Sequence, residues 1–445
     1  MLALKKKGIL LTSLMSMALA VSACGSNSNG NSASGSPSAS ASGNVSPSAS
    51  SPASSSAAAP AGAKQKLTLM IAWPGDSIGQ SEEKLVAEHF KDKYDITFKP
   101  VSDPEKTIKT TIASGNPVDL AFYWPGQMDT FVNADMALDL TPYLEANNGE
   151  WKNAFVDGAL TKGIYNDKVY AVPITPVYYS MLANKDLLDQ AGVTLPDYPT
   201  WDEFKTALTT IKEKLGIAPF GNSWASWTHR SFLQSIWPDD AKEHEWSQGQ
   251  IPFTDPAVVK AFDEVKTLYD DGYMYPGKGA LTVTQDQVLS GFKSGKVAIV
   301  AWINFLSDQA IKNSGLKNVQ VVSWPHMGPR VKIPGDSNGY MIPANAKHPE
   351  ASIEILKYLT SLEVAQHRVD NGSPVSIKGV TAADPNISKF GRDASKLYTE
   401  KEILTLSPKL NEYLDQKMPA NYVFNPKSAL AELEKLRLEA IKDKK

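Results

Sequence analysis

The sequence has one cysteine among 445 residues, Cys24, and only six histidines. A lone cysteine cannot form an intramolecular disulfide, so the folded part must be held together by its core. The histidines occur singly, without the spacing of a metal site. A G-x-S-x-G elbow and a glycine-rich phosphate loop are also lacking. We therefore expect a protein that is not an enzyme and that uses neither cofactor nor metal.

Charge of one sign is not in excess either. The chain has 45 basic and 48 acidic residues, a net charge of -3. Loss of an N-terminal segment with Lys5, Lys6 and Lys7 would leave 42 basic residues against 48 acidic ones, a net charge of -6. This mildly acidic balance, without a basic block, argues against nucleic acid as the main partner.

The N-terminus has the order of a secretion signal. Three lysines precede an apolar run from Ile9 to Val21, and small residues follow it. That run is too short for a permanent membrane helix, and no second apolar stretch reaches spanning length, so we interpret residues 1–23 as a signal peptide. The segment from Val21 to Cys24 resembles the bacterial lipobox, which implies that Cys24 is lipidated and begins the mature chain.

A polar segment follows this cysteine. Residues 25–63 are almost entirely Ser, Ala, Gly, Asn and Pro, with no charged residue. Such a composition cannot bury enough apolar surface to offset its ordering entropy. We expect residues 24–64 to be a lipid-anchored, flexible tether on the outer face of the cell membrane, of a length that suits a Gram-positive surface.

Beyond the tether, apolar runs alternate with segments of helical periodicity. This alternation indicates an α/β fold with a mostly parallel sheet. Strands are expected at 66–73, 95–101, 118–124, 297–303 and 319–324, and helices at 81–94, 104–114 and 256–271 and from residues 201, 349 and 426. Asp103-Pro104 and a capping box from Thr200 to Glu203 are the clearest helix starts.

Several motifs, in order, resemble the carbohydrate-type extracellular solute-binding proteins of ABC importers, the maltose-binding protein family. They occupy residues 116–120, 168–173, 182–204, 291–299, 339–343 and 348–352. The resemblance extends from Lys66 to about Ala365. It implies a two-lobed, periplasmic-binding-protein-like fold of type II with a ligand cleft between the lobes. Lobe 1 would comprise residues 65–176 and 342–395, and lobe 2 residues 177–341 and 396–445.

Sugars present flat C–H faces and many hydroxyls, which proteins meet with aromatic rings and planar polar groups. Tyr123 or Trp124 and Trp302 stand where the family carries stacking rings. Maltose-binding protein has an acidic residue just after the motif at residues 168–173, at the position where this chain has Val177. This difference argues against a ligand with the hydroxyl pattern of maltose. The predicted ligand-binding residues are Trp73, Tyr123, Trp124, Tyr178 (or Tyr179), Trp224, Trp227, Arg230, Trp302, Asn304, Trp324 and Tyr340. Trp224 and Trp227 are expected in a loop, whereas Trp151, Trp201, Trp237 and Trp246 are expected to pack in the core.

The sequence thus predicts a monomeric, membrane-tethered receptor that captures a carbohydrate, of oligosaccharide size, by lobe closure. It would deliver the sugar to the permease subunits of an ABC transporter. One alternative is a surface-anchored glycan hydrolase, since two facing carboxylates need no sequence motif. Another keeps the fold but binds a charged solute such as a uronate-containing sugar, with Arg230 or Arg330 pairing its anionic group.

Overall fold

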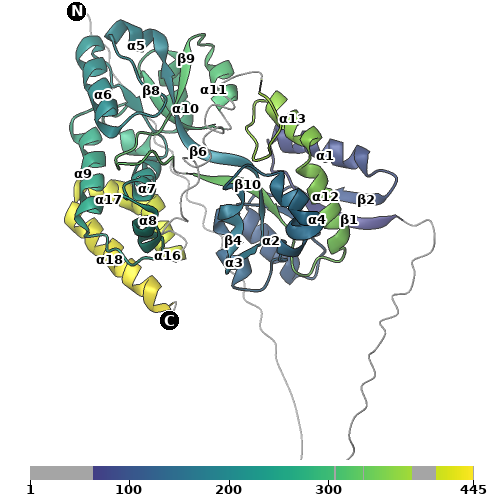
Figure 1. Ribbon diagram of the computed structural model, residues 1–445. Helices are drawn as coiled ribbons and strands as arrows, with labels where there is room; N and C mark the ends of the chain where they lie inside the picture. The colour runs from purple at the N-terminus through teal and green to yellow at the C-terminus, as the bar shows by residue number, and fades with distance from the viewer. Residues whose placement is uncertain (1–63, 305–306, 334, 383–406, 444–445) are drawn as a thin grey trace, which may run out of the picture. The chain divides into compact units, whose positions relative to one another are not determined.

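The computed structural model describes residues 64–304, 307–333, 335–382 and 407–443, which all belong to one unit, Ala61–Lys445 (Figure 1). The expected signal peptide, Cys24 and nearly all of the expected tether lie outside these ranges, as does the expected lobe boundary near residue 395. Over the described ranges, none of the helices combines the length and the apolar composition that crossing a membrane requires.

The strands and helices alternate along the chain, as expected. The strands are β1 (Gln65–Met70), β2 (Tyr94–Phe98), β3 (Leu120–Tyr123), β4 (Ile164–Tyr165), β5 (Lys168–Val169), β6 (Val172–Asn184), β7 (Phe220–Gly221), β8 (Ile299–Ile303), β9 (Val319–Ser323) and β10 (Gly335–Met341). The helices are α1 (Ser77–His89), α2 (Pro104–Ala113), α3 (Asp129–Val132), α4 (Thr141–Asn153), α5 (Lys185–Ala191), α6 (Trp201–Leu215), α7 (Ala225–Ser235), α8 (Asp240–Ser247), α9 (Pro256–Asp270), α10 (Gln285–Lys293), α11 (Ser307–Ser314), α12 (Pro349–Leu359), α13 (Leu362–Asp370), α16 (Pro408–Glu412), α17 (Met418–Phe424) and α18 (Pro426–Asp443). Short helical turns occur at η1 (Pro125–Gln127), η2 (Ala159–Gly163), η3 (Ala280–Thr282) and η6 (Tyr413–Lys417), the last of them π-helical.

The two clearest expected helix starts are confirmed, whereas the helix expected from residue 81 begins at Ser77. The Asp103 carboxylate accepts a hydrogen bond from the Lys106 N–H at the start of α2. At α6, the Thr200 hydroxyl accepts from the Glu203 N–H, while the Glu203 carboxylate accepts from the Thr200 N–H. Each pair satisfies backbone donors that the first helical turn leaves open.

One long strand connects two parts of the sheet, whose order is β2-β1-β3-β10-β6-β8-β7, with β9 also on β6. The first half of β6 pairs with β10, and its second half, from Tyr179, pairs with β8 and β9 (Figure 1). We call β2, β1, β3, β10 and the start of β6 the first half-sheet. The second half-sheet comprises the rest of β6 with β8, β9 and β7.

The expectation of a mostly parallel sheet is wrong. The pairs β1–β2, β1–β3 and β7–β8 are parallel, but β10 and β6 run antiparallel to all their neighbours. Strand β10 approaches β6 closely at two of its glycines. A Cβ on Gly339 would lie 2.3 Å from the Val172 carbonyl oxygen, and one on Gly335 would lie 2.1 Å from the Val177 carbonyl oxygen. Glycine permits this approach because it has no Cβ.

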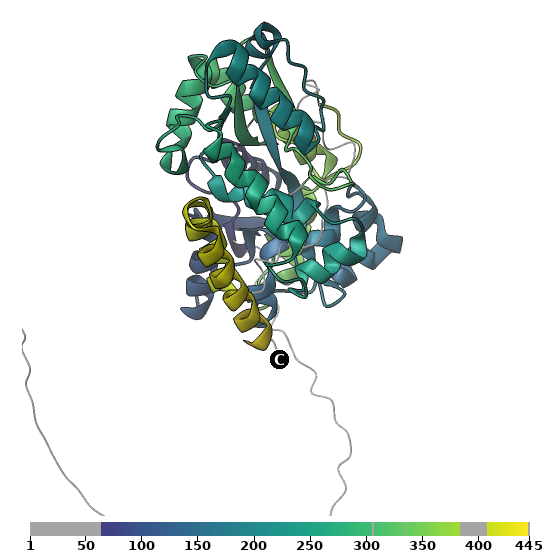
Figure 2. The ribbon, with the colours of Figure 1, turned by 90° about the vertical axis from the view of Figure 1, so that its left-hand side faces the viewer.

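The hydrophobic core is divided in the same way as the sheet. Two clusters combine residues from 67–174 with residues from 340–377, around the first half-sheet. Around the second half-sheet, one cluster combines residues from 179–324 with residues from 410–440, and another lies within residues 178–333. Helices α17 and α18 lie beside α9 in Figures 1 and 2, and their apolar residues share a cluster with those of α9. The exact lobe boundaries stay a prediction.

Candidate functional site

Two cavities of about 360 Å³ each lie at the ends of the strands of the first half-sheet. This volume suits a small ligand or one or two units of a larger one. The aromatic cavity is the one lined by Tyr123, Trp124, Tyr179, Trp227, Arg230, Asp336, Asp415 and neighbouring residues. The arginine cavity is the one lined by Trp73, Asp76, Thr175, Asn338, Tyr340, Arg368 and neighbouring residues.

Segments far apart in the sequence meet at the aromatic cavity. Trp124 follows β3, Asp336 lies on β10, Tyr179 on β6, Trp227 on α7 and Asp415 on η6. Trp124 is half-buried and contacts Phe122 and Tyr123 at interplanar angles of 79° and 56°, so neither ring stacks in parallel on its indole. The aromatic cavity therefore combines large aromatic groups with planar polar ones, the pair of surfaces that a sugar ring requires.

Ion pairs and hydrogen bonds hold the polar groups of this cavity. The Arg230 guanidinium lies 3.2 Å from the Asp415 carboxylate, which joins α7 to the π-helical turn η6. Asp336 accepts a hydrogen bond from the Gly126 N–H at 3.0 Å, joining β10 to η1. Single π-helical turns are rare and recur at functional sites.

The wall of the cavity beside β3 has a negative electrostatic character. The Tyr123 hydroxyl donates to Glu105 at 3.3 Å. Burial, and next the carboxylates of Glu105 and Asp129, raise the pKa of Tyr123, so this phenol stays protonated as a hydrogen-bond donor. Lys162 also lines this cavity and is buried.

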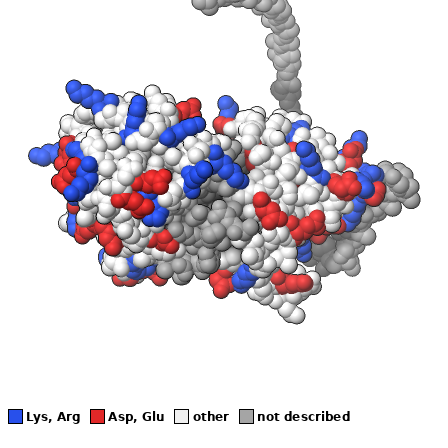
Figure 3. Space-filling model, turned by 90° about the horizontal axis from the view of Figure 1, so that it is seen from above, with Lys and Arg blue, Asp and Glu red and all other residues white. Residues whose placement is uncertain are grey.

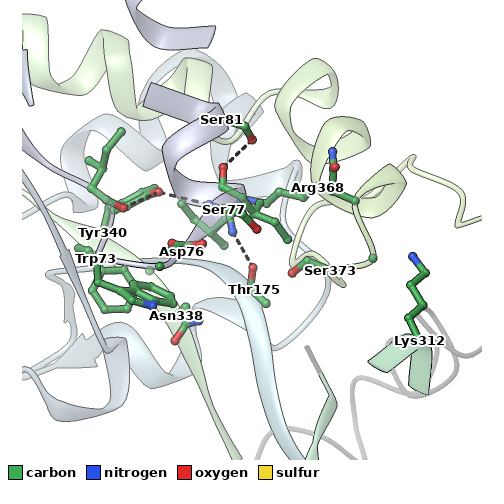
Figure 4. A pocket seen from close by; sticks show the side chains of 18 of the residues that line it. Trp73, Asp76, Ser77, Ser81, Thr175, Lys312, Asn338, Tyr340, Arg368 and Ser373 are labelled. Carbon is green, nitrogen blue, oxygen red and sulfur yellow. Dashed lines mark hydrogen bonds between the residues drawn. The ribbon is translucent and has the colours of Figure 1, made fainter. Parts of the chain in front are cut away.

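The arginine cavity contains polar side chains around one half-buried indole, that of Trp73. Figure 4 shows Trp73 and Asn338 on one side of the cavity and Ser373 and Lys312 on the other. The Arg368 guanidinium donates to the Thr175 hydroxyl at 2.9 Å and to the Tyr340 hydroxyl at 3.2 Å. Burial raises the pKa of Asp76.

Six of the predicted residues line these cavities. Tyr123, Trp124, Trp227 and Arg230 line the aromatic cavity, and Trp73 and Tyr340 line the arginine cavity. The structure brings Trp73 and Trp124 into contact with one shared ring: the Phe122 centroid lies 4.9 Å from that of Trp73 and 5.6 Å from that of Trp124. Their role in ligand binding stays a prediction.

The other five line neither cavity, although Tyr179, the alternative to Tyr178, lines the aromatic cavity. Trp302 and Trp324 are each 2% exposed and pack in the core around the second half-sheet. Asn304 accepts from the Tyr178 N–H and donates to the Pro176 carbonyl, so it holds the backbone of β6. Trp224 contacts Trp227 and Trp302. The expected loop around Trp224 and Trp227 is wrong, because α7 begins at Ala225.

Four tryptophans were expected to pack in the core rather than to bind the ligand. Trp151, Trp201, Trp237 and Trp246 are all buried, which confirms that they pack in the core.

Within the described ranges, no three His, Cys, Asp or Glu side chains gather as a metal site would require. Figure 3 shows basic and acidic side chains interspersed over the described part of one face.

Sequence reasoning missed several lining residues: Asp76, Thr175, Asp336, Asn338, Arg368 and Asp415. Arg368 could have been found, because the apolar spacing of α13 through Val364, Ala365 and Val369 places this charged residue on the buried face. Asp415 gave no such signal, since its place depends on how the C-terminal helices pack.

Comparison with known proteins gives the family. The family model described as bacterial extracellular solute-binding protein matches residues 72–366. A binding protein of Brucella abortus (strain 2308) is 25% identical over 258 residues, 57% of this chain and 60% of its own length. The chain thus spans less than two thirds of that relative. The multiple sugar-binding protein of Streptococcus mutans serotype c (strain ATCC 700610 / UA159) is 25% identical over 306 residues, 65% of this chain and 69% of its own length.

A solved structure shows the same fold. The apo form of RafE from Streptococcus pneumoniae superposes with a TM-score of 0.69 at 20% identity, covering 86% of this chain and 100% of that one. The two-lobed fold of solute-binding proteins, expected from the sequence, is thereby confirmed. The matched family consists of binding proteins rather than enzymes. The chain belongs to the bacterial extracellular solute-binding protein family.

Proposed function

We propose that this protein is the substrate-binding receptor of an ABC importer and that it binds a carbohydrate, of oligosaccharide size, in the cavities described above. The aromatic cavity is the observation that carries this proposal. The indole of Trp124, on which neither neighbouring ring stacks in parallel, suits the C–H face of a sugar ring, and Arg230, Asp336 and Asp415 suit its hydroxyls. The similarity to a multiple sugar-binding protein supports the same class of ligand.

The proposed mechanism is closure of two lobes on the ligand. A ligand that contacts both lobes stabilises the closed form over the open form by its additional contacts. Trp124 and Asp336 lie on or beside the first half-sheet, whereas Trp227 and Arg230 lie on α7, which packs with the second. A ligand that bridges these groups would provide such contacts, and the closed form would then dock on the permease.

The place of action is proposed from the sequence alone. The lipobox-like segment ending at Cys24 and the uncharged run behind it suit a monomeric receptor anchored by lipid to the outer face of the membrane. Metabolic labelling with a fatty-acid analogue tests the anchor. The wild-type chain should be labelled, and the Cys24→Ala chain should not.

A thermal-shift measurement tests the ligand class. A cognate oligosaccharide at about 100 times its Kd should stabilise the folded protein by about 2.7 kcal/mol. A panel of neutral glycans is the probe, with the Trp124→Ala variant as the matched control. The wild type should be stabilised by the full amount and the variant, which we expect to bind about 30-fold more weakly, by less than about 1 kcal/mol at the same concentration. A wild type that no glycan stabilises would contradict the proposal.

The two alternatives are less well supported. For a uronate, both candidate cations are already engaged: Arg230 by Asp415, and Arg330 by Asp240 and Glu243. For a hydrolase, the family consists of binding proteins. Incubation with candidate polysaccharides, followed by measurement of released reducing ends, tests turnover directly. Continuous release would overturn the receptor proposal.

A further inference from the structure

Two tryptophans at the start of α7 stack on each other. Trp224 is the residue before the helix and Trp227 lies in its first turn, a spacing that places both on one helix face. Their ring centroids are 4.3 Å apart and their planes differ by 13°. Tyr179 of β6 stacks on Trp227 as well, at 4.7 Å and 13°.

The indole of Trp227 therefore has a neighbour on each face. Two rings cannot lie parallel to the same face of one indole at these distances without overlapping, so Tyr179 and Trp224 cover opposite faces. A sugar ring cannot stack on Trp227 in this arrangement. What Trp227 can offer to the aromatic cavity is its edge, which includes the Nε1–H donor.

The stack is supported at both ends by one pair of strands. Trp224 contacts Trp302 of β8 at 5.4 Å, and Trp302 is 2% exposed. In the sheet, Ser180 pairs with Trp302, and Tyr179 pairs with Ile303. The ring contacts thus run from β8 through α7 to the adjacent position of β6.

We propose that Trp224 is a positioning residue of the ligand site: it fixes the indole of Trp227 against Tyr179 so that the Trp227 edge points into the aromatic cavity. Trp224 itself lines neither cavity. This inference rests on the proposed function and revises the expectation that Trp224 contacts the ligand. Replacing Trp224 by an aliphatic residue would remove one stacking partner and leave the lining residues unchanged.

Calorimetric titration tests the proposal with raffinose, xylotriose and chitotriose as probes. The Trp224→Leu variant should bind the best of these probes about tenfold more weakly than the wild type, because the Trp227 edge loses its fixed orientation. Trp224→Phe keeps a ring in the stack and should stay within about threefold of the wild type. Trp246→Phe, a change away from the stack in the hydrophobic cluster against which Trp227 packs, is the matched control and should bind normally.

A general loss of stability would not give this pattern, since all three variants alter a tryptophan packed in or against the core around the second half-sheet. Wild-type affinity in a folded Trp224→Leu variant would overturn the proposal. Equal weakening in Trp224→Phe and Trp224→Leu would overturn it as well.

A ligand-free measurement separates this proposal from the proposed function. Two indoles stacked in parallel interact as coupled chromophores and should give a paired band in the circular dichroism spectrum. Trp224→Phe and Trp227→Phe should each remove the contribution of this pair to the band, and Trp151→Phe, whose ring contact is with Phe155, should keep it. If no probe binds but the band behaves in this way, the choice of ligand is wrong and the stacked geometry holds. A wild type without the band overturns the positioning role, whether or not a sugar binds.

Discussion

Arg368 and Glu82 form an ion pair in the interior of the protein. The Arg368 guanidinium donates to the carboxylate of Glu82, which is fully buried in α1. The same guanidinium reaches Thr175 of β6 and Tyr340 of β10, the two strands that approach each other at Gly339. One side chain thus connects α1 and α13 to both long strands beneath the arginine cavity.

Breaking this pair should destabilise the protein strongly. Glu82→Gln leaves the buried Arg368 charge without its ion-pair partner, which should lower the free energy of unfolding by about 3–5 kcal/mol. Glu82→Gln combined with Arg368→Met removes both charges. This double change should lower the free energy of unfolding by less than the sum of the two single changes. Urea unfolding measures both effects. Glu88→Gln, at the exposed pair with Lys91, is the control and should change stability by less than about 1 kcal/mol. Additive single and double changes would contradict a coupled pair.

The pH dependence of stability should reveal His229. Burial lowers the pKa of this side chain to about 4, from 6.5. The unfolded chain therefore binds a proton more readily than the folded one between these values. The stability contributed by neutral His229 is complete above about pH 6.5 and is lost as the pH falls towards 4, by up to about 3 kcal/mol.

A non-titrating replacement isolates this contribution. His229→Gln should lose less stability than the wild type between pH 7 and pH 4.5, measured by urea unfolding at each pH. His244→Gln, a change at an exposed histidine, should follow the wild-type curve. Parallel curves for the wild type and the His229 variant would show that His229 titrates normally in the folded protein.

The Arg230–Asp415 pair should determine the affinity of the site for anionic sugars relative to neutral ones. In the wild type the Arg230 guanidinium is paired with the Asp415 carboxylate, so a uronate would gain little binding energy from Arg230. Asp415→Asn removes that competing charge and should improve the affinity for a glucuronate oligosaccharide, relative to the matching glucose oligosaccharide, by about tenfold at low salt. Calorimetry at two salt concentrations measures the ratio. An unchanged ratio would mean that Arg230 does not face the ligand.

Local chemistry made much of the fold predictable. Asp103-Pro104 and the Thr200–Glu203 capping box gave correct helix starts because these interactions lie within one turn of the chain. The direction of β10 and the second half of β6 could not be predicted in this way, because strand direction depends on residues more than a hundred positions apart. The parallel pairing expected from the alternation of elements was therefore wrong for these strands.

The candidate site was only partly predictable for the same reason. Trp73 and Trp124 follow β1 and β3 within a few residues, so their place beyond the strand ends could be predicted from the sequence. Trp302 lies within β8, where burial on both faces of the second half-sheet encloses it. Trp224 was predicted to bind the ligand from a loop, and its stacking on Trp227 could not be predicted without the position of Tyr179. Glu82 and Arg368 gave a signal that was not used, charged residues on the buried faces of α1 and α13.

The central claim, that Trp124 of the aromatic cavity binds a sugar, is tested most directly by calorimetric titration of an oligosaccharide panel into the wild type, Trp124→Ala and Trp151→Phe. The account predicts saturable heat from at least one neutral oligosaccharide. Binding should be about 30-fold weaker in Trp124→Ala, since a central aromatic contact contributes about 2 kcal/mol, and unchanged in Trp151→Phe, whose ring packs away from both cavities. No heat from any member of the panel, or equal affinity in the wild type and Trp124→Ala, would contradict it.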